Sequence, residues 1–394
     1  MIKIDSNRCT GCGACQNACP KNCISMVENE EGFRYPVIDK DKCVNCNLCE
    51  KSCHLYNPLE KLKSLRMEKP KVLICRALKV DTCEKSMTGG IAYMCGKSII
   101  EKGGVVFGAK GNVIDGVYHT KCETIEELEE TRWSKYLQSD LGETYKEAKA
   151  ELKKGRLVLF TGTPCQISGF YSFLGDYPDN LFTLDLICHG VPSKYVFERY
   201  VKELEEEHGS KVLNFYRDKK NGARPCSFTC LFENGDSFTN VGGENSFNRL
   251  FVSNTITRKS CQKCNYQKVP RVADISVGDY LYRNKCKELD PDNIGLSLIS
   301  LNTVKGSEIF KEVENNYFIK EISIEEGINE SEHLFKAPKS NIFRRTFFSL
   351  LRKNSYKKTA KIIIPQNGFH RFVRRIYGVF CYGFEFFYNM THKA

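Results

Sequence analysis

Residues 9–19 read CTGCGACQNAC and residues 43–53 read CVNCNLCEKSC, so the spacing C-x2-C-x2-C-x3-C occurs twice near the start of the chain. The first copy holds Cys9, Cys12, Cys15 and Cys19, and the second holds Cys43, Cys46, Cys49 and Cys53. This spacing puts three thiolates on one tight loop and a fourth in the helix that follows, which suits a 4Fe-4S cluster. The repeat therefore predicts two such clusters.

The ligands of the two clusters are expected to cross over between the repeats. In two-cluster ferredoxins the fourth cysteine of each run binds the other cluster. One predicted set is therefore Cys9, Cys12, Cys15 and Cys53, and the other is Cys43, Cys46, Cys49 and Cys19. Residues 24–27 and 35–38 are expected to pair as short strands beneath the clusters, with residues 28–32 as their turn.

Zinc and disulfides are the two alternatives for the cysteine repeat. Pairs of the form C-x2-C also bind zinc, but a zinc site needs only four ligands and gives no reason for a repeated triplet. Disulfide frameworks are typical of small secreted domains, whereas this chain has 394 residues. A cluster domain explains the repeat better than either alternative.

Length and composition exclude several classes of protein. The chain is long enough for two or three domains. No charged segment followed by an apolar run opens it, so secretion by that route is not expected, and no apolar stretch reaches the roughly 18 residues of a membrane span. The 21 cysteines, read as thiols and cluster ligands, indicate a reducing compartment. We therefore expect a cytoplasmic protein.

A strand, a glycine turn and a helix are predicted after residue 70. Residues 71–78 are apolar and β-branched, and residues 91–102 resemble a helix. Between them, residues 86–90 read Ser-Met-Thr-Gly-Gly, where backbone N–H groups and hydroxyls can bind a phosphate. A Gly-Gly pair also occurs in ordinary turns. Farther along, Lys135 can neutralise a phosphate and Tyr136 can stack on an aromatic ring, although an ordinary loop is the alternative.

Two further cysteines follow predicted strands of an α/β sheet. Residues 157–160 lead into a glycine-containing loop with Cys165, and residues 181–187 lead into Cys188. The carboxyl ends of such strands are the usual place for ligands. A further pair, Cys261 and Cys264, would complete a four-thiolate set for a third cluster, with zinc as the alternative. Nearby competitors for this set are Cys226, Cys230 and Cys286.

The order of the motifs carries a family resemblance. They are Thr88-Gly89-Gly90, Lys135-Tyr136 with Ser139, Gly162-Thr163-Pro164-Cys165-Gln166, Cys188-His189-Gly190, Cys261 with Cys264, and Ala273-Asp274-Ile275-Ser276-Val277-Gly278-Asp279. Over about residues 70–300 the chain thereby resembles the coenzyme F-420 hydrogenase/dehydrogenase beta-subunit family. It departs from the family pattern at residues 86–88, where a serine is missing, and at residues 280–282, Tyr-Leu-Tyr, where an aromatic-glycine step is usual. These departures leave the substrate open.

The resemblance implies non-covalent FAD and a 4Fe-4S cluster in a catalytic region. The flavin contacts that it implies are Ser86, Thr88, Gly89, Gly90, Lys135, Tyr136, Ser139, Gly162, Thr163 and Pro164. The implied ligands of the third cluster are Cys165, Cys188, Cys261 and Cys264. No residue stands out as a proton donor, and His189 is the candidate.

Four segments follow from these assignments. Residues 1–58 are the ferredoxin-like domain with two 4Fe-4S clusters, residues 70–150 and 151–335 are the two parts of the flavin region, and residues 336–394 are a basic aromatic tail. The expected fold class is α/β, with mixed α+β character, preceded by the small ferredoxin-like domain and followed by a helical tail.

The expected function is that of an iron-sulfur flavoprotein oxidoreductase. Electrons would pass between the clusters and FAD. A flavin is needed because each cluster carries one electron, whereas most organic reductions need two. The external partner would be ferredoxin, a reduced deazaflavin coenzyme or another small organic substrate, with surface-polysaccharide synthesis as one setting. A non-catalytic electron-transfer subunit that serves a partner oxidoreductase is the alternative.

The net charge of +11 is a property of the tail alone. Residues 336–394 carry 13 Lys and Arg against one acidic residue, whereas the first 335 residues carry 46 basic and 47 acidic residues. Nucleic acid is therefore not the expected partner. An amphipathic helix is predicted over residues 341–353, and a second basic, aromatic run follows Pro365. Both can lie on the inner face of a membrane, with packing against the catalytic region as the alternative.

Overall fold

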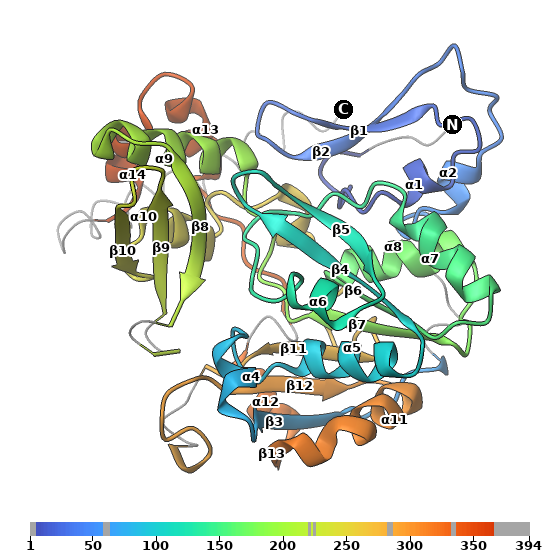
Figure 1. Cartoon of the computed structure of the whole chain (residues 1–394). Coiled ribbons are helices and arrows are strands. Elements are labelled where there is room, and N and C mark those ends of the chain that lie inside the picture. Colours follow the sequence, from blue (N-terminus) through green and yellow to red (C-terminus); the bar gives the residue numbers. More distant parts are fainter. Residues whose placement is uncertain are drawn as a thin grey trace.

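An eight-stranded mixed sheet forms the centre of the chain in a computed structural model (Figure 1). The structure describes residues 5–57, 64–219, 222–223, 226–281, 287–331 and 336–365. The strands of this sheet are β3 (Lys71–Ala77), β4 (Val105–Asn112), β5 (Gly116–Cys122), β6 (Val158–Gly162), β7 (Leu181–Leu186), β11 (Ile275–Asp279), β12 (Ser297–Leu301) and β13 (Tyr317–Ile322). Their order is β13-β3-β12-β11-β7-β6-β4-β5, and the four strands from β11 to β4 run parallel.

The parallel strands are buried on both faces, which explains why they read as apolar runs in the sequence. In β6, Val158 and Phe160 face one apolar cluster while Leu159 faces another, because successive side chains of a strand point to opposite sides. Helices α7 (Thr144–Lys153) and α8 (Pro164–Leu174) cover the first face. Helices α5 (Ile91–Glu101) and α11 (Val304–Val313) cover the second. The loops after β6 and β7 consequently meet at one edge of the sheet.

A separate three-stranded antiparallel sheet lies to the side of the large one (Figure 1). Its strands are β8 (Val212–Asp218), β9 (Ser227–Phe232) and β10 (Ser237–Val241), and the helices beside it are α9 (Lys194–His208), α10 (Ser246–Val252), α13 (Arg344–Leu351) and α14 (Tyr356–Ile363). The hairpin between β9 and β10 turns at Asn234-Gly235, a pair typical of hairpin turns, with the Phe232 amide donating to the Asp236 carbonyl at 3.0 Å.

The helix predicted over residues 341–353 forms as α13, but its apolar face is covered. Phe347, Phe348 and Leu351 are buried in the apolar cluster of the small sheet. For this helix the chain follows the alternative of packing back, so α13 has no apolar face left for a membrane. The second basic run, after Pro365, lies outside the described residues.

The N-terminal domain is a hairpin with two one-turn helices. Strands β1 (Ile24–Glu28) and β2 (Arg34–Ile38) pair antiparallel as predicted, and helices α1 (Ala14–Asn17) and α2 (Leu48–Lys51) follow the two cysteine loops. In Figure 1 this domain lies against α7 and α8. The expected fold class, a mixed α/β protein preceded by a small two-cluster domain, is confirmed.

Direct polar contacts fasten the N-terminal domain to the rest of the chain. Asn17 Nδ2 donates to the Gly142 carbonyl at 2.9 Å, and the Arg34 guanidinium lies 2.9 Å from the Asp140 carboxylate. The backbone of Tyr195 packs closely against Gly32. A Cβ atom on Gly32 would lie 2.3 Å from the backbone nitrogen of Tyr195. The domain is therefore docked on the large sheet by specific contacts.

The remaining described helices are short. They are α4 (Val80–Glu84), α6 (Ile125–Glu129) and α12 (Ile324–Glu330). Across the described ranges, none of the helices combines the length and apolar character that a bilayer crossing requires.

Candidate functional site

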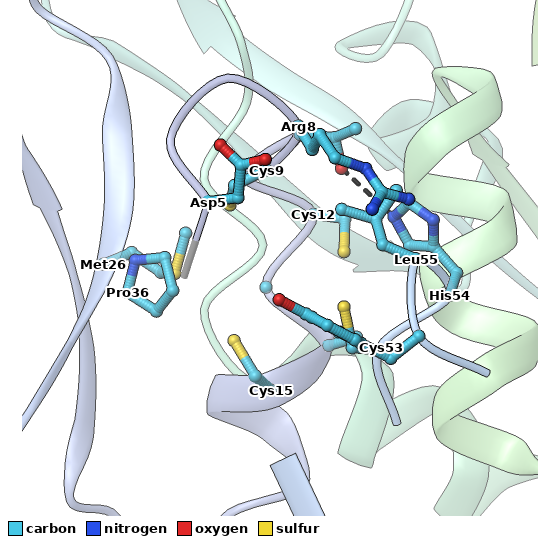
Figure 2. A pocket seen from close by; sticks show the side chains of 15 residues that line it. Asp5, Arg8, Cys9, Cys12, Cys15, Met26, Pro36, Cys53, His54 and Leu55 are labelled. Carbon is cyan, nitrogen blue, oxygen red and sulfur yellow. Dashed lines mark hydrogen bonds between the residues drawn. The ribbon is translucent and has the colours of Figure 1, made fainter. Parts of the chain in front are cut away.

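The first cavity is lined by Cys9, Cys12, Cys15 and Cys53, the crossed set predicted from the sequence. It encloses about 530 Å³, part of it open to solvent. Figure 2 shows the side chains of Cys12, Cys15 and Cys53 directed toward the same hollow. Because Cys53 comes from the second repeat, the end of α2 must fold back over the first cysteine loop to complete this set.

The loop of the first cavity depends on two glycines in the left-handed region. Gly11 has a φ of 69° and Gly13 a φ of 71°, a conformation that side chains disfavour. The thiols that the loop presents are strongly desolvated. Burial raises the pKa of Cys15 to about 12 and that of Cys12 well above its usual value. Thiolates at these positions therefore need a cation such as iron to replace their protons.

Five cysteines, not four, line the second cavity. Four are the predicted Cys19, Cys43, Cys46 and Cys49, and the fifth is Cys23. The sulfurs of Cys19 and Cys23 lie 3.3 Å apart, and their shared hydrogen bond raises the pKa of Cys23 to about 11. Sequence reasoning missed Cys23, although its position four residues after Cys19 was a usable signal.

The third cavity contains all four cysteines that were predicted for it. It encloses about 410 Å³, and its cysteines are Cys165, Cys188, Cys261 and Cys264. Cys165 lies in the first turn of α8, and Cys188 follows β7. Cys261 lies in a short 3-10 turn (Lys259–Lys263), and Cys264 directly follows that turn. Burial raises the pKa of Cys165 to about 11 and that of Cys261 to about 12. Separate segments of the chain thus bring these thiols together.

Two of the competing cysteines, Cys226 and Cys230, do not line the third cavity. Cys230 is buried in the apolar cluster of the small sheet, and Cys226 lies at the edge of that sheet near Gly242. Cys286 lies outside the described residues.

The first and third cavities share a wall. Thr10 lines both of them, and its hydroxyl lies 3.2 Å from Nε2 of His54. The other ring nitrogen of His54 is hydrogen-bonded to the hydroxyl of Tyr266. Burial lowers the pKa of His54 to about 4. His54 is therefore neutral at neutral pH. It hydrogen-bonds Thr10, which lines both cavities, and Tyr266.

The residues of the predicted glycine loop are bonded within the chain. The Thr88 hydroxyl and the Gly89 amide each lie 2.8 Å from the Ser297 hydroxyl, and Arg132 donates to Ser86 Oγ at 2.8 Å. A Cβ on Gly89 would lie 2.7 Å from the Cys75 carbonyl, so close packing already requires a glycine there. The role of Ser86, Thr88, Gly89 and Gly90 in flavin binding stays a prediction.

The predicted contacts in residues 135–139 belong to an ordered loop. Lys135 Nζ donates to the Arg132 carbonyl at 2.5 Å, and burial lowers the pKa of Lys135 to about 8. The Tyr136 ring packs edge-on against Phe228 at 5.3 Å between centroids. Gln166 donates to Ser139 Oγ at 3.1 Å.

The Gly162 to Pro164 loop lies at the third cavity. Thr163 and Pro164 line this cavity, and the Thr163 hydroxyl lies 3.2 Å from Cys165 Sγ. Thr163 also forms a capping box with Gln166 at the start of α8. His189, the candidate proton donor, lies with Nε2 3.1 Å from the Phe251 carbonyl. Its catalytic role stays a prediction.

A buried ion pair joins the glycine loop to Tyr136. Arg217 on β8 lies 2.7 Å from the Asp279 carboxylate at the end of β11, and Asp279 pairs across the sheet with Ser297. Arg217 also lowers the pKa of the buried Tyr136 hydroxyl, against the larger effect of burial, which raises it. Thr88, Ser297, Asp279, Arg217 and Tyr136 therefore form a polar line between the two sheets. Asp279 could be recognised in the sequence as the end of a family motif, whereas no pattern marked Arg217.

Two family models match the chain. Residues 155–327 match the model that describes the C terminus of the beta subunit of coenzyme F420 hydrogenase/dehydrogenase, and residues 8–55 match a 4Fe-4S dicluster domain. No curated protein matches.

A solved structure is also similar to the chain. It belongs to the F420-reducing NiFe hydrogenase complex from Methanosarcina barkeri, studied by xenon derivatization. The identity is 20%, the TM-score is 0.46, and the match covers 74% of this chain and 91% of that chain. In the order of the chain, the two models describe a segment similar to a 4Fe-4S dicluster domain, followed by a segment similar to the C terminus of the coenzyme F420 hydrogenase/dehydrogenase beta subunit.

Proposed function

We propose that the chain is an iron-sulfur flavoprotein oxidoreductase. It would pass electrons between 4Fe-4S clusters and FAD, to or from a deazaflavin coenzyme or another small organic substrate. The observation that carries the proposal is the pair of adjoining cavities, each lined by four cysteines and both lined by Thr10. Neighbouring clusters in these cavities would connect the N-terminal domain to the larger region.

The chemistry of the cavities supports clusters as their occupants. Each holds thiols around a hollow, and among the described residues no three His, Cys, Asp or Glu side chains are placed to hold a single metal ion. A cubane suits such walls, since four irons separate its thiolates. When bound, FAD would supply the exchange between one-electron and two-electron chemistry. The chain's own part is to hold the centres close together and to keep water from the buried thiols.

The polar line from Thr88 to Tyr136 is the proposed flavin wall. It lies where α5 begins, directly after Gly90, and the N-terminus of a helix favours an anion such as a phosphate. The Arg217 guanidinium of the same wall is paired with Asp279, and its buried Nε has no hydrogen-bond partner among the described groups, which leaves a donor for a ligand. These features fit an anionic dinucleotide.

Cofactor analysis after anaerobic purification tests the proposal. Three clusters correspond to about twelve irons per chain, and the flavin region predicts one FAD. About eight irons would remove the third cluster, and absence of flavin would refute the flavoprotein proposal. Turnover of a deazaflavin or another two-electron acceptor with reduced ferredoxin would then establish the enzymatic activity.

A non-catalytic electron-transfer subunit is the second candidate. Cys46 at the second cavity is exposed, and the neighbouring Val44 and Leu48 are 56% and 40% exposed. An apolar rim around an accessible cluster suits contact with a protein partner such as ferredoxin. If the flavin is reduced but no small molecule reoxidises it without a partner protein, this candidate replaces the first.

The setting of the reaction is also a proposal. Cytoplasmic location is proposed from the many cysteines, read as thiols and cluster ligands, and a role in surface-polysaccharide synthesis is proposed from the resemblance alone. Peripheral membrane contact would be electrostatic, because the exposed residues of α14 include Lys357, Lys358 and Lys361 while its apolar face is buried. Binding to anionic vesicles that does not weaken with salt would contradict this contact.

A further inference from the structure

Arg258 is a fully buried cation that forms no ion pair with a carboxylate in the described part of the chain. Its side chain is 0% exposed. Its hydrogen bonds go to neutral acceptors: Nε to the Cys9 carbonyl at 2.9 Å, Nη2 to the Arg34 carbonyl at 2.6 Å and Nη1 to Gln138 Oε1 at 3.3 Å. Burying a charge is costly unless an opposite charge compensates it.

Arg258 lies between two cysteine sets. Its guanidinium bonds the carbonyl of Cys9, a member of the first set, and it approaches so near that a Cβ on Gly11 would stand 2.9 Å from Nη1. On the other side it precedes Cys261 of the third set by three residues, at the start of the 3-10 turn that contains Cys261 and is followed directly by Cys264. The Cys261 amide donates to the Arg258 carbonyl at 3.0 Å.

A second buried arginine, Arg344, has its charge compensated by a carboxylate. Arg344 also lies beside the Phe33 ring, at 5.9 Å from its centroid, where Arg258 lies at 5.7 Å. Arg344, however, forms a two-pronged ion pair with Glu31, with distances of 3.0 and 2.6 Å. The two arginines differ in having, or lacking, a carboxylate.

We propose that Arg258 is a positioning residue whose charge is compensated by the iron-sulfur clusters of the first and third cavities and raises their reduction potentials. A 4Fe-4S cluster with four thiolates is an anion, and its reduction adds one further negative charge. One electron leaves the external donor, such as reduced ferredoxin, and one electron enters the cluster. The buried cation favours the reduced form, because charges interact strongly in a medium that excludes water. The inference rests on the clusters of the proposed function and not on the flavin.

A purely structural role is the alternative reading of Arg258. Its three hydrogen bonds hold the first cysteine loop, β2 and residue 138 together, so their loss alone could disturb the site. Lysine separates the two roles, because Arg258→Lys keeps the charge and loses the planar fork of donors. The structural role predicts that Lys and Gln at this position are equally harmful.

The test is a redox titration of the full chain, purified anaerobically and followed by electron paramagnetic resonance. For Arg258→Gln we expect the equilibrium constant for one-electron reduction to fall about tenfold in two of the cluster signals, a shift of about 59 mV to lower potential. The signal that disappears in Cys46→Ser identifies the second cavity and should not shift. Iron and sulfide content report whether the clusters remain.

Arg344→Gln is the matched control, because it removes a buried cation whose charge Glu31 already compensates. We expect less than a threefold change in any cluster signal in that variant. Arg258→Lys should retain iron and stay within about threefold of the natural protein. Unchanged potentials in iron-replete Arg258→Gln would overturn the proposal, as would loss of iron from both Arg258 variants. Flavin content is measured separately, so its absence would refute the flavoprotein and leave this test intact.

Discussion

Cys23 and Cys19 present two sulfurs to the same corner of the second cavity. They lie 3.3 Å apart and both are buried. In a ferredoxin-like repeat the fourth cysteine of the run is the expected ligand, yet at this separation either sulfur can approach the same iron after a small side-chain rotation. Ligand choice at this corner is therefore decided by side-chain geometry at the scale of a single residue.

Single and double substitutions should separate the two sulfurs. Cys23→Ser is expected to leave the iron content near that of the natural chain, because Cys19 remains. Cys19→Ser should retain much of it through Cys23, whereas the double variant should lose about four irons. Iron and sulfide analysis after anaerobic purification measures this. Loss of about four irons from Cys23→Ser alone would identify Cys23 as the native ligand.

His119 on β5 makes stability depend on pH. Its Nε2 lies 2.8 Å from the Thr161 carbonyl, Nδ1 has no hydrogen-bond partner among the described groups, and burial lowers the pKa of His119 to about 4. Below about pH 6.5 His119 becomes protonated in the unfolded chain and stays neutral in the folded chain. The free energy of unfolding therefore falls as the pH drops from about 6.5 to about 4. The full loss is about 3 kcal/mol.

His119→Gln should remove this contribution, because the amide can donate to the Thr161 carbonyl and does not titrate. The difference in free energy of unfolding between variant and natural chain should change by about 3 kcal/mol across that window. Anaerobic urea titrations at several pH values measure it. His54 titrates in both proteins and cancels in the difference. A difference that stays constant with pH would show that His119 is accessible to protons in the folded chain.

At the scale of elements, α8 meets the first cavity through a glycine. A Cβ on Gly169 would lie 2.8 Å from Cys12 Sγ and 3.2 Å from the Tyr145 hydroxyl. The helix therefore approaches the cysteine loop closely enough to form the shared wall only because this position lacks a side chain. The N-terminal end of the same helix carries Cys165 of the third cavity, so α8 connects two cysteine sets.

Gly169→Ala should disturb the first cavity. We expect loss of about four irons, because the added methyl group displaces Cys12. Gly96→Ala on α5 is the matched control, since its Cβ would first meet the flexible end of Leu128 at 3.0 Å, away from all the cysteine sets. Iron content and the number of resonance signals report the outcome. Full iron content in Gly169→Ala would mean that α8 shifts without affecting the ligands.

At the scale of the whole molecule, the end of the described chain returns to the beginning. Arg344 at the start of α13 pairs with Glu31 of the N-terminal domain, while Phe347 and Phe348 of the same helix are buried beside the small sheet. The two partners of this ion pair are 313 residues apart in the chain. Helix α13 thus holds distant parts of the chain together, and its removal should affect folding and not only surface binding.

Phe347→Ala tests this role of α13. Phe347 is fully buried, so its truncation should lower the free energy of unfolding by about 3–5 kcal/mol. Ile362→Ala on α14, where the side chain is 44% exposed, should change it by about 0.5 kcal/mol. Urea unfolding of both variants gives the comparison. Equal stability of the two variants would show that α13 contributes nothing to the fold.

Local patterns in the sequence predicted the loop-and-helix form of the two cysteine repeats and the β1–β2 hairpin. These features depend on residues a few positions apart, whose geometry follows from backbone and side-chain chemistry alone. The four cysteines of the third cavity were grouped from motif order, and the structure brings them together.

Only the tertiary structure decided which of these features meet. Contacts between distant segments are the hydrogen bonds of Arg258 to the N-terminal domain, the wall shared through Thr10, the Arg217–Asp279 pair and the covered face of α13. Such contacts depend on the order of strands in the sheet and on how close two backbones approach, neither of which a linear pattern contains. The sequence by itself therefore predicted the three cysteine sets apart from Cys23, because their spacing and motif order are visible along the chain, while packing decided that two of these sets share one wall and one buried cation.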